Sequence, residues 1–343
     1  MRLQYAMLRR CFPTGALAAL LMFAHAVCAQ EPAPIASSSL LKVQPAEKSA
    51  AAAKAPILAA TNAGKRIVTV GDYGIVLLSD DNGKSFRQAA TVPVSSTLTA
   101  VSFADAKNGW AVGHWGVILN TVDGGEHWTI QRTETQVDRP LFSVHFFDTH
   151  EGVAVGLWSL LLTTHDGGKN WGSVTLPAPP DGGKADCNLF DAFASAKGTL
   201  FVAAERGLIL RSEDRGKTWQ YIVTGYKGSF WTGLSLKRGA LLVAGLRGTV
   251  YRSADDGLTW LAVNSGVKSS ITDMVQAGER VVAVGLDGIR LESADDGSTF
   301  TSTQRDDRLS MTAAVMGDNP AALVLFSQKG IVPVGMASGG ANH

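Results

Sequence analysis

Cysteine is scarce in this chain of 343 residues, and so is net charge. The three cysteines are Cys11, Cys28 and Cys187, and the formal net charge is +1. The first two lie in a leader-like segment, so a mature chain keeps Cys187 alone, which excludes an internal disulfide and a cysteine-based metal site. Nucleic-acid binding needs a concentrated basic face, which the charge balance does not favour. We therefore expect no cofactor, no metal and no nucleic-acid partner.

An apolar run long enough to cross a membrane is also missing. The stretch 15–27 is shorter than the roughly 20 residues that a transmembrane helix needs. It is preceded by Arg2, Arg9 and Arg10 and followed by small residues at 27–29. Residues 1–29 are therefore predicted to be a secretory signal peptide. The residues before Cys28 do not form a good lipoprotein box, so we expect a soluble protein in the periplasm, or in the thylakoid lumen of a photosynthetic host.

Composition divides the rest of the chain into an arm, one large domain and a tail. Residues 30–55 are rich in Ala, Pro, Ser and Lys and are predicted to be a linker or arm. The domain is expected over 56–336 and the tail over 337–343.

Six copies of one eight-residue pattern dominate the domain. The pattern, here called the aspartate motif, is Ser/Thr-x-Asp-x-Gly-x-x-Trp/Phe, and its aspartates lie 42, 43, 48, 41 and 40 residues apart. They are Asp81, Asp123, Asp166, Asp214, Asp255 and Asp295. A period near forty is typical of a β-propeller with four-stranded blades.

A second repeated feature, a short turn with Gly on one or both sides, sets the number of blades. It occurs seven times, from 70–74 to 325–330, and the last copy has no aspartate motif after it. We therefore predict an all-β, seven-bladed propeller with an incomplete last blade. In the second repeat the strands are expected at 98–103, 109–113, 117–121 and 128–132. Leu40–Val43 is a candidate fourth strand for the last blade, the alternative being a three-stranded blade.

Turn chemistry explains the aspartate motif without catalysis. The carboxylate can accept backbone N–H groups in the hairpin between the third and fourth strands, while the Gly adopts a positive φ. The Trp or Phe buries a large ring between sheets. All six aspartates are therefore predicted to be structural.

The motif identifies a resemblance to a known family. The run 109–116, Gly-Trp-Ala-Val-Gly-His-Trp-Gly, followed by the motif 121–128, is the Asp-box (bacterial neuraminidase repeat) pattern and resembles that of photosystem II assembly and stability factors. The resemblance covers about 57–335. It implies a non-enzymatic, exported propeller that binds a membrane protein or its precursor during assembly, through an arginine-rich surface. Arg206 and Arg247, at matching places in adjacent repeats, are the partial counterparts here.

Topology selects the rim where a partner would bind. The aspartate motifs lie on one rim, and the turns between second and third strands lie on the other, together with the loops between blades. Binding sites usually occupy such loops, and Tyr, Trp and Arg dominate binding hot spots. The candidate residues on this rim are Tyr73, His114, Trp115, Trp158, Arg206, Arg247 and Asp287. Alternatively, the two Trp cap the apolar layers and the arginines form surface ion pairs.

The competing interpretation is a glycoside hydrolase of the sialidase or xyloglucanase type, because such enzymes also carry Asp-boxes. Glycoside hydrolysis needs two carboxyls about 5–10 Å apart or a tyrosine nucleophile. Glu205 with Asp72 or Asp287 is the best acidic set on the binding rim. Blades of near-uniform length leave little room for catalytic insertions, so no catalytic residue is assigned. We expect a monomer that binds a membrane protein or complex.

Overall fold

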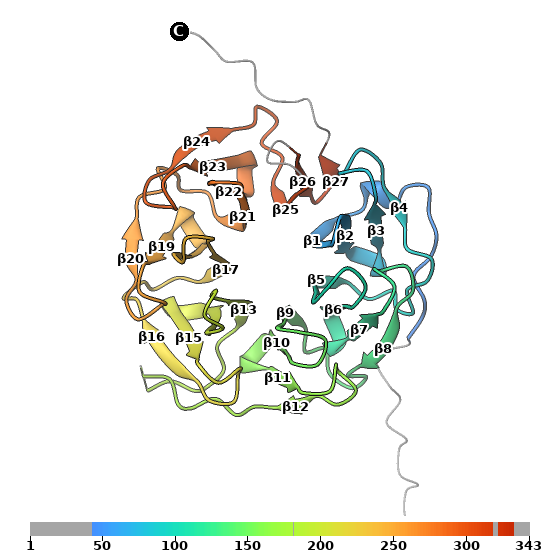
Figure 1. The fold of residues 1–343 in the computed structure, drawn as a ribbon, viewed down its shortest axis with the longest axis horizontal. Coiled ribbons are helices and arrows are strands. Elements are labelled where there is room, and N and C mark those ends of the chain that lie inside the picture. The colour runs from blue at the N-terminus through green and yellow to red at the C-terminus, as the bar shows by residue number, and fades with distance from the viewer. Residues whose placement is uncertain (1–42, 181, 318–321, 333–343) are drawn as a thin grey trace, which may run out of the picture. The chain divides into compact units, whose positions relative to one another are not determined.

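The computed structural model describes residues 43–180, 182–317 and 322–332. Seven antiparallel sheets form a ring, and six of them have four strands (Figure 1). The seventh has three strands within the described residues. The predicted seven-bladed, all-β propeller is confirmed.

The blades follow one another along the chain. Blade 1 consists of β1 (Ile57–Ala63), β2 (Arg66–Gly71), β3 (Val76–Ser79) and β4 (Arg87–Gln88). Blade 2 consists of β5 (Leu98–Phe103), β6 (Gly109–Gly113), β7 (Ile118–Thr121) and β8 (Thr129–Arg132), and blade 3 of β9 (Leu141–Phe146), β10 (Gly152–Gly156), β11 (Leu161–Thr164) and β12 (Gly172–Ser173). Blade 4 consists of β13 (Leu189–Ala194), β14 (Leu200–Ala204), β15 (Leu208–Ser212) and β16 (Gln220–Val223). Blade 5 consists of β17 (Phe230–Ser235), β18 (Leu241–Gly245), β19 (Val250–Ser253) and β20 (Leu261–Val263). Blade 6 consists of β21 (Ile271–Ala277), β22 (Arg280–Gly285), β23 (Ile289–Ser293) and β24 (Thr301–Gln304). Blade 7 consists of β25 (Met311–Met316), β26 (Leu323–Ser327) and β27 (Gly330–Val332).

The helical elements are 3-10 turns of three residues each. They are η1 (Ala52–Lys54), η2 (Asp72–Gly74), η3 (His114–Gly116), η4 (Leu157–Ser159), η5 (Glu205–Gly207), η6 (Leu246–Gly248) and η7 (Leu286–Gly288). None of the helices in the described residues is long and apolar enough to span a membrane.

The first strand of each blade lines the centre of the ring, and its hydrogen bonds join neighbouring blades (Figure 1). Thr99, second in its strand, donates its hydroxyl to the carbonyl of Leu141, which begins the next inner strand, at 2.6 Å. Thr272 donates in the same way to Met311 at 2.8 Å. Thr312 donates to Ile57 and so links the last blade to the first.

Apolar side chains fill the space between adjacent sheets. At the seam where the ring closes, Ile57, Ile67 and Leu77 of blade 1 pack with Val315 and Phe326 of blade 7, and all are buried. Burying such side chains stabilises a fold by roughly 1.5–3 kcal/mol each. The ring is therefore closed by the same packing that joins its other blades.

The arm before β1 crosses this seam. The Ala46 amide donates to the Val92 carbonyl at 3.0 Å, beyond the outer edge of blade 1. A few residues later η1 packs against β27, and Ala52 is only 4% exposed within the seam cluster. Of the predicted closing strand Leu40–Val43, residues 40–42 lie outside the described residues and Val43 belongs to no strand. Within the described residues, blade 7 is three-stranded and η1 covers its last strand.

The aspartate motifs close the outer hairpins as a network of side-chain hydrogen bonds. In blade 4, Ser212 donates to one oxygen of Asp214 at 2.8 Å, and its own oxygen accepts the Gly216 amide at 2.8 Å. The Thr218 amide donates to that same carboxylate oxygen, and the Thr218 hydroxyl donates to the other at 2.6 Å. The six motifs share this pattern, with the seventh residue as donor in each: Ser85, His127, Asn170, Thr218, Thr259 and Thr299.

We predict that Asp214→Ala lowers the free energy of unfolding by about 1–3 kcal/mol, because it leaves several turn donors without an acceptor. Thermal or urea denaturation measures the change. Lys217→Ala, at an exposed position of the same turn, is the matched control and should unfold like the wild type. A stable Asp214→Ala protein that had lost partner binding would contradict the structural role.

A candidate binding rim

Six of the turns between second and third strands share one strained backbone geometry. Their central residues have φ between 53° and 61°, although none is glycine: Tyr73, Trp115, Trp158, Arg206, Arg247 and Asp287. This left-handed conformation costs a non-glycine residue about 1–2 kcal/mol. The backbone geometry of these turns is therefore constant around the rim opposite the aspartate motifs, while the side chain at the central position varies.

The three aromatic tips differ in how far they project. The side chains of Tyr73 and Trp158 are 69% and 56% exposed, whereas Trp115 is half-buried against the core between blades 1 and 2. The Trp115 amide donates to Asp138 at 2.6 Å, and His114 lies 2.8 Å from the other carboxylate oxygen of Asp138. Trp115 thus caps an apolar layer, whereas Tyr73 and Trp158 are exposed to solvent.

The two arginine tips also differ. Arg206 folds onto the loop between blades 3 and 4, where its guanidinium donates to the Lys184 carbonyl at 3.2 Å and to the Cys187 sulfur. Arg247 is exposed, and its backbone amide donates to the hydroxyl oxygen of Ser270, just before the next blade, at 3.2 Å. Asp287 is exposed and accepts a hydrogen bond from Ser269 at 2.9 Å. Arg247 is therefore the arginine that is available for a partner.

The long loop 177–188 joins the tips of blades 3 and 4. The Trp158 amide donates to the Asn188 side chain at 3.2 Å, and Asn188 donates to both carboxylate oxygens of Glu205, at 3.0 and 2.8 Å. Ser159 donates its amide to the Cys187 carbonyl at 2.8 Å. The loop therefore accepts hydrogen bonds from the backbone beside Trp158 and from the guanidinium of Arg206.

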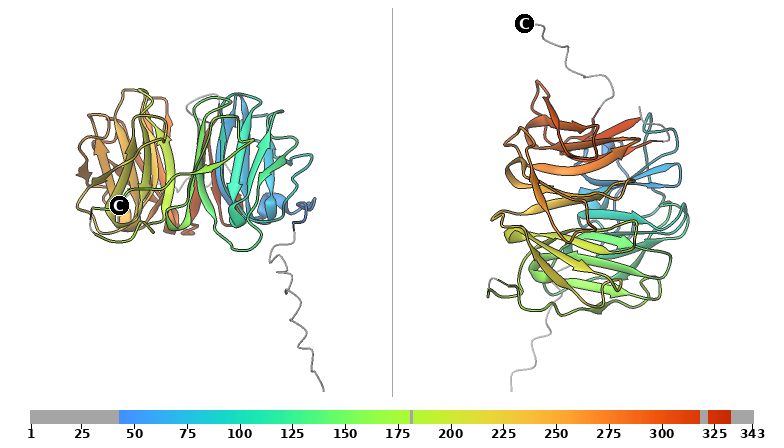
Figure 2. Two further views of the ribbon diagram at one scale, coloured as in Figure 1. Left: turned by 90° about the horizontal axis from the view of Figure 1, so that it is seen from below. Right: turned by 60° about the vertical axis from the view of Figure 1, so that its left-hand side comes forward.

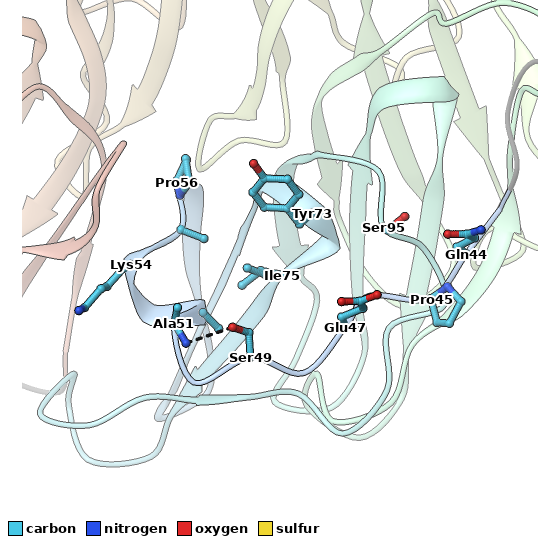
Figure 3. Close-up of a pocket in the computed structure, with 12 residues that line it drawn as sticks. Gln44, Pro45, Glu47, Ser49, Ala51, Lys54, Pro56, Tyr73, Ile75 and Ser95 are labelled. Carbon is cyan, nitrogen blue, oxygen red and sulfur yellow. Dashed lines mark hydrogen bonds between the residues drawn. The ribbon is translucent and has the colours of Figure 1, made fainter.

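A pocket of about 600 Å³ opens beside the tip of blade 1, between this tip and the arm (Figure 3). Tyr73 forms one edge, and Ile75 and Ala52, both nearly buried, contribute apolar surface. Ala51 faces the pocket from the arm. This pocket could not be predicted from the repeats, because it depends on where the arm passes blade 1.

The central channel holds two carboxylates that the sequence analysis did not single out. Asp191 and Asp273 are each third in their inner strands and line a cavity of about 330 Å³. Asp191 accepts the Ser143 hydroxyl from blade 3 at 2.9 Å and the Gly233 amide from blade 5 at 2.8 Å. Asp273 accepts the Ala314 amide of blade 7 at 2.8 Å. Both carboxylates thus join neighbouring blades.

Burial within the ring raises the pKa of both channel carboxyls. It raises the pKa of Asp273 to about 7, with a further contribution from the charge of Asp191. The pKa of Asp191 is also raised by burial, although hydrogen bonds from Gly233 and Ser143 oppose the shift. Both aspartates are half-buried and line the cavity of the channel.

The acidic residues of the binding rim do not form a pair. Glu205, Asp72 and Asp287 lie at the tips of blades 4, 1 and 6, which are spread around the ring (Figure 1). Each carboxylate accepts a hydrogen bond from a nearby side chain: Glu205 from Asn188, Asp72 from Thr97 at 3.0 Å and Asp287 from Ser269. No metal-binding group of three or more His, Cys, Asp or Glu occurs in the described part of the chain.

The ring has two opposite rims, which the edge-on ribbon view shows as the two faces of the disc (Figure 2, left), and their side chains differ in role. On one, the polar side chains of the motifs bond one another; on the other, the tips present exposed aromatic and charged groups. The architecture and repeats define a seven-bladed β-propeller with motif-closed outer hairpins. A model of the family described as photosynthesis system II assembly factor YCF48 matches residues 87–264, more than half of the chain. The protein belongs to this family, as the repeat pattern indicated.

Solved structures of similar fold include two YCF48 proteins. "YCF48 bound to D1 peptide" is 18% identical, with a TM-score of 0.66 over 84% of this chain and 98% of that chain. YCF48 from Cyanidioschyzon merolae is 15% identical, with a TM-score of 0.62 over 81% and 94%. The Cps50 (Swd1) propeller domain of Myceliophteria thermophila is 13% identical, with a TM-score of 0.64 over 83% and 96%. At these identities the likeness shows the fold alone. No curated protein matches the chain significantly.

We predict that Asp273 makes the fold less stable as the pH rises from about 4 to about 7. Its pKa is about 7 in the folded protein and near 3.8 in the unfolded chain. The folded state therefore binds more protons in this window, and raising the pH favours unfolding. Melting temperatures measured across the window should fall less steeply for Asp273→Asn. Asp287→Asn, at an exposed tip, is the control; an unchanged slope in Asp273→Asn would contradict the assignment.

Proposed function

We propose that this protein is an exported, non-enzymatic propeller that binds a membrane protein or membrane complex as an assembly or accessory factor. The observation that carries the proposal is the row of projecting tips on one rim, above all Trp158 and Arg247, in a member of the YCF48 family. Trp and Arg are common in binding hot spots.

The comparison suggests the form in which a partner would be presented. One solved YCF48 is bound to a D1 peptide. By analogy, we propose that the present chain takes a peptide segment of its partner across the tips. A specific interface buries on the order of 800 Å² per partner, an area that requires several neighbouring tips. Trp158 on blade 3 and Arg247 on blade 5 lie on either side of the tip of blade 4, so a segment that contacts both would span three successive tips.

The geometry gives no support to the hydrolase alternative. The candidate acids Glu205, Asp72 and Asp287 lie on separate blades and bond their own loops. Two carboxyls about 5–10 Å apart are needed on either side of a glycosidic bond. A binding role requires no such pair.

We predict that Trp158→Ala combined with Arg247→Ala weakens capture of the partner from detergent-solubilised membranes of the source organism. Loss of one hot-spot side chain costs about 2 kcal/mol or more of binding energy, so the double variant should bind at least about tenfold more weakly. Both side chains project from the rim, so the melting temperature should stay nearly unchanged. Binding is followed by quantitative mass spectrometry of the captured proteins and then by titration with the purified partner.

Leu258→Ala is the matched control, because Leu258 is 62% exposed on the opposite rim. Capture that is equally strong in the double variant would contradict the proposed rim. Turnover of a sialoside or β-glucan by the purified protein, lost on Glu205→Gln, would favour the hydrolase.

Export is part of the same proposal, and it is motivated by the basic start and apolar stretch of residues 1–29. We predict that protein isolated from the source organism begins near Gln30 and is recovered with the periplasmic or lumenal fraction. N-terminal sequencing and cell fractionation measure this. An intact amino terminus in the cytoplasmic fraction would contradict it.

A further inference from the structure

We propose that the pocket between the arm and the tip of blade 1 binds an extended peptide through one apolar side chain flanked by two opposite charges. The inference rests on the proposed function in one respect: it places an anchor for the partner segment beside Tyr73. Residues of the arm form much of the pocket wall.

The pocket lies between the tip of blade 1 and the arm, which hydrogen bonds fix at both ends. At one end Ser49 donates its amide to the Gln88 side chain at 2.8 Å, and Gln88 donates back to the Glu47 carbonyl at 3.0 Å. At the other end the Pro56 carbonyl accepts the Asp72 amide at 3.1 Å. The space left between them is about 600 Å³, within the usual range of about 300–1,000 Å³ for ligand pockets.

The walls suit an aliphatic side chain on a peptide backbone. Ile75 and Ala52, 6% and 4% exposed, provide an apolar floor, and the ring of Tyr73 stands over Ile75 (Figure 3). The Ser49 oxygen accepts the Ala51 amide at 3.1 Å, which leaves the hydroxyl proton for a ligand carbonyl. An apolar anchor in a pocket, with a polar edge that fixes its orientation, is the usual design of a peptide site.

Charge complementarity indicates what flanks the anchor. Lys54 lies on one side of Tyr73 and Ile75, and Glu47 lies on the other (Figure 3). Both are exposed, and within the described residues neither side chain forms an ion pair. A peptide with an acidic residue toward Lys54 and a basic residue toward Glu47 meets both charges, whereas the reverse order meets two like charges.

Two synthetic pentapeptides test the inference on the full chain. One is lysine-glycine-leucine-glycine-glutamate and the other has the two charged residues exchanged, both with blocked ends and a fluorescent label. Fluorescence anisotropy should show that one of them binds about tenfold more tightly than the other, a difference of about 1.4 kcal/mol. Exchanging the charges of the protein, with Glu47→Lys and Lys54→Glu together, should invert the preference. A third peptide with glycine in place of leucine should bind more weakly than either.

Ala51→Trp locates the site. Ala51 is exposed and lines the pocket, so a tryptophan there should fill it and weaken the preferred peptide about tenfold or more. Ala53→Trp, exposed in the same turn but outside the pocket, is the matched control and should bind as the wild type does. Equal melting temperatures for the two variants exclude unfolding as the cause.

The outcomes separate this inference from the proposed function. Failure of all three peptides to bind, or equal binding by wild type and Ala51→Trp, overturns the pocket whatever the membrane capture shows. Absence of a charge preference, or a preference that the charge exchange leaves in place, overturns the assigned flanking residues. Peptide binding with the expected preference supports the pocket. If membrane capture is also unaffected by Trp158→Ala and Arg247→Ala, the proposed role of these two side chains in binding the partner is overturned while the pocket stands.

Discussion

Closure of the ring is the constraint on which the rest of the molecule depends. Each sheet packs its faces against the two adjacent sheets, so an open ring would leave apolar surface of blades 1 and 7 in water. Phe326 and Val315 on one side of the seam and Ile57 and Ile67 on the other are all buried. The hydrogen bond from Thr312 to Ile57 repeats at this seam the link that Thr99 and Thr272 make elsewhere. Within the described residues, blade 7 is held in place by this packing and this hydrogen bond, and the arm adds Ala52 from outside.

A closed ring explains why its rim can support recognition. In six of the turns the central residue is held in a left-handed conformation by flanking strands that are paired on both sides. This conformation has a local energetic cost. Side chains as different as Trp158, Arg247 and Asp287 occupy the same backbone position. Variation at these tips changes the chemistry of the surface without changing the scaffold, which agrees with the general separation of fold from function.

The repeat made the architecture predictable, whereas the site depends on contacts between distant parts of the chain. Gly-flanked turns and aspartate motifs recur because the blades have the same kinds of turn between their strands. The strands of the second repeat were therefore predicted to within a residue. Arg206 and Arg247 are equivalent in sequence, yet only Arg206 meets an inserted loop that carries Cys187. The arm has no hydrophobic period, so neither its contact with β27 nor the pocket beside Tyr73 could be predicted. Asp191 and Asp273 stand out only once the inner strands are placed around a channel.

The aspartate motifs use both oxygens of their carboxylates within their own turns. Hydrogen bonds from the seventh motif residue hold the pKa of Asp81, Asp166 and Asp295 at about 2, so these carboxylates carry no proton at neutral pH. A general acid needs a proton to donate, and a carboxylate that binds a partner needs free acceptor sites. In these turns the two oxygens already accept hydrogen bonds from residues of the same motif. On the other rim, Tyr73, Trp158 and Arg247 project into solvent. One rim therefore uses its polar groups to close the outer hairpin within each blade, and the other leaves these three side chains exposed.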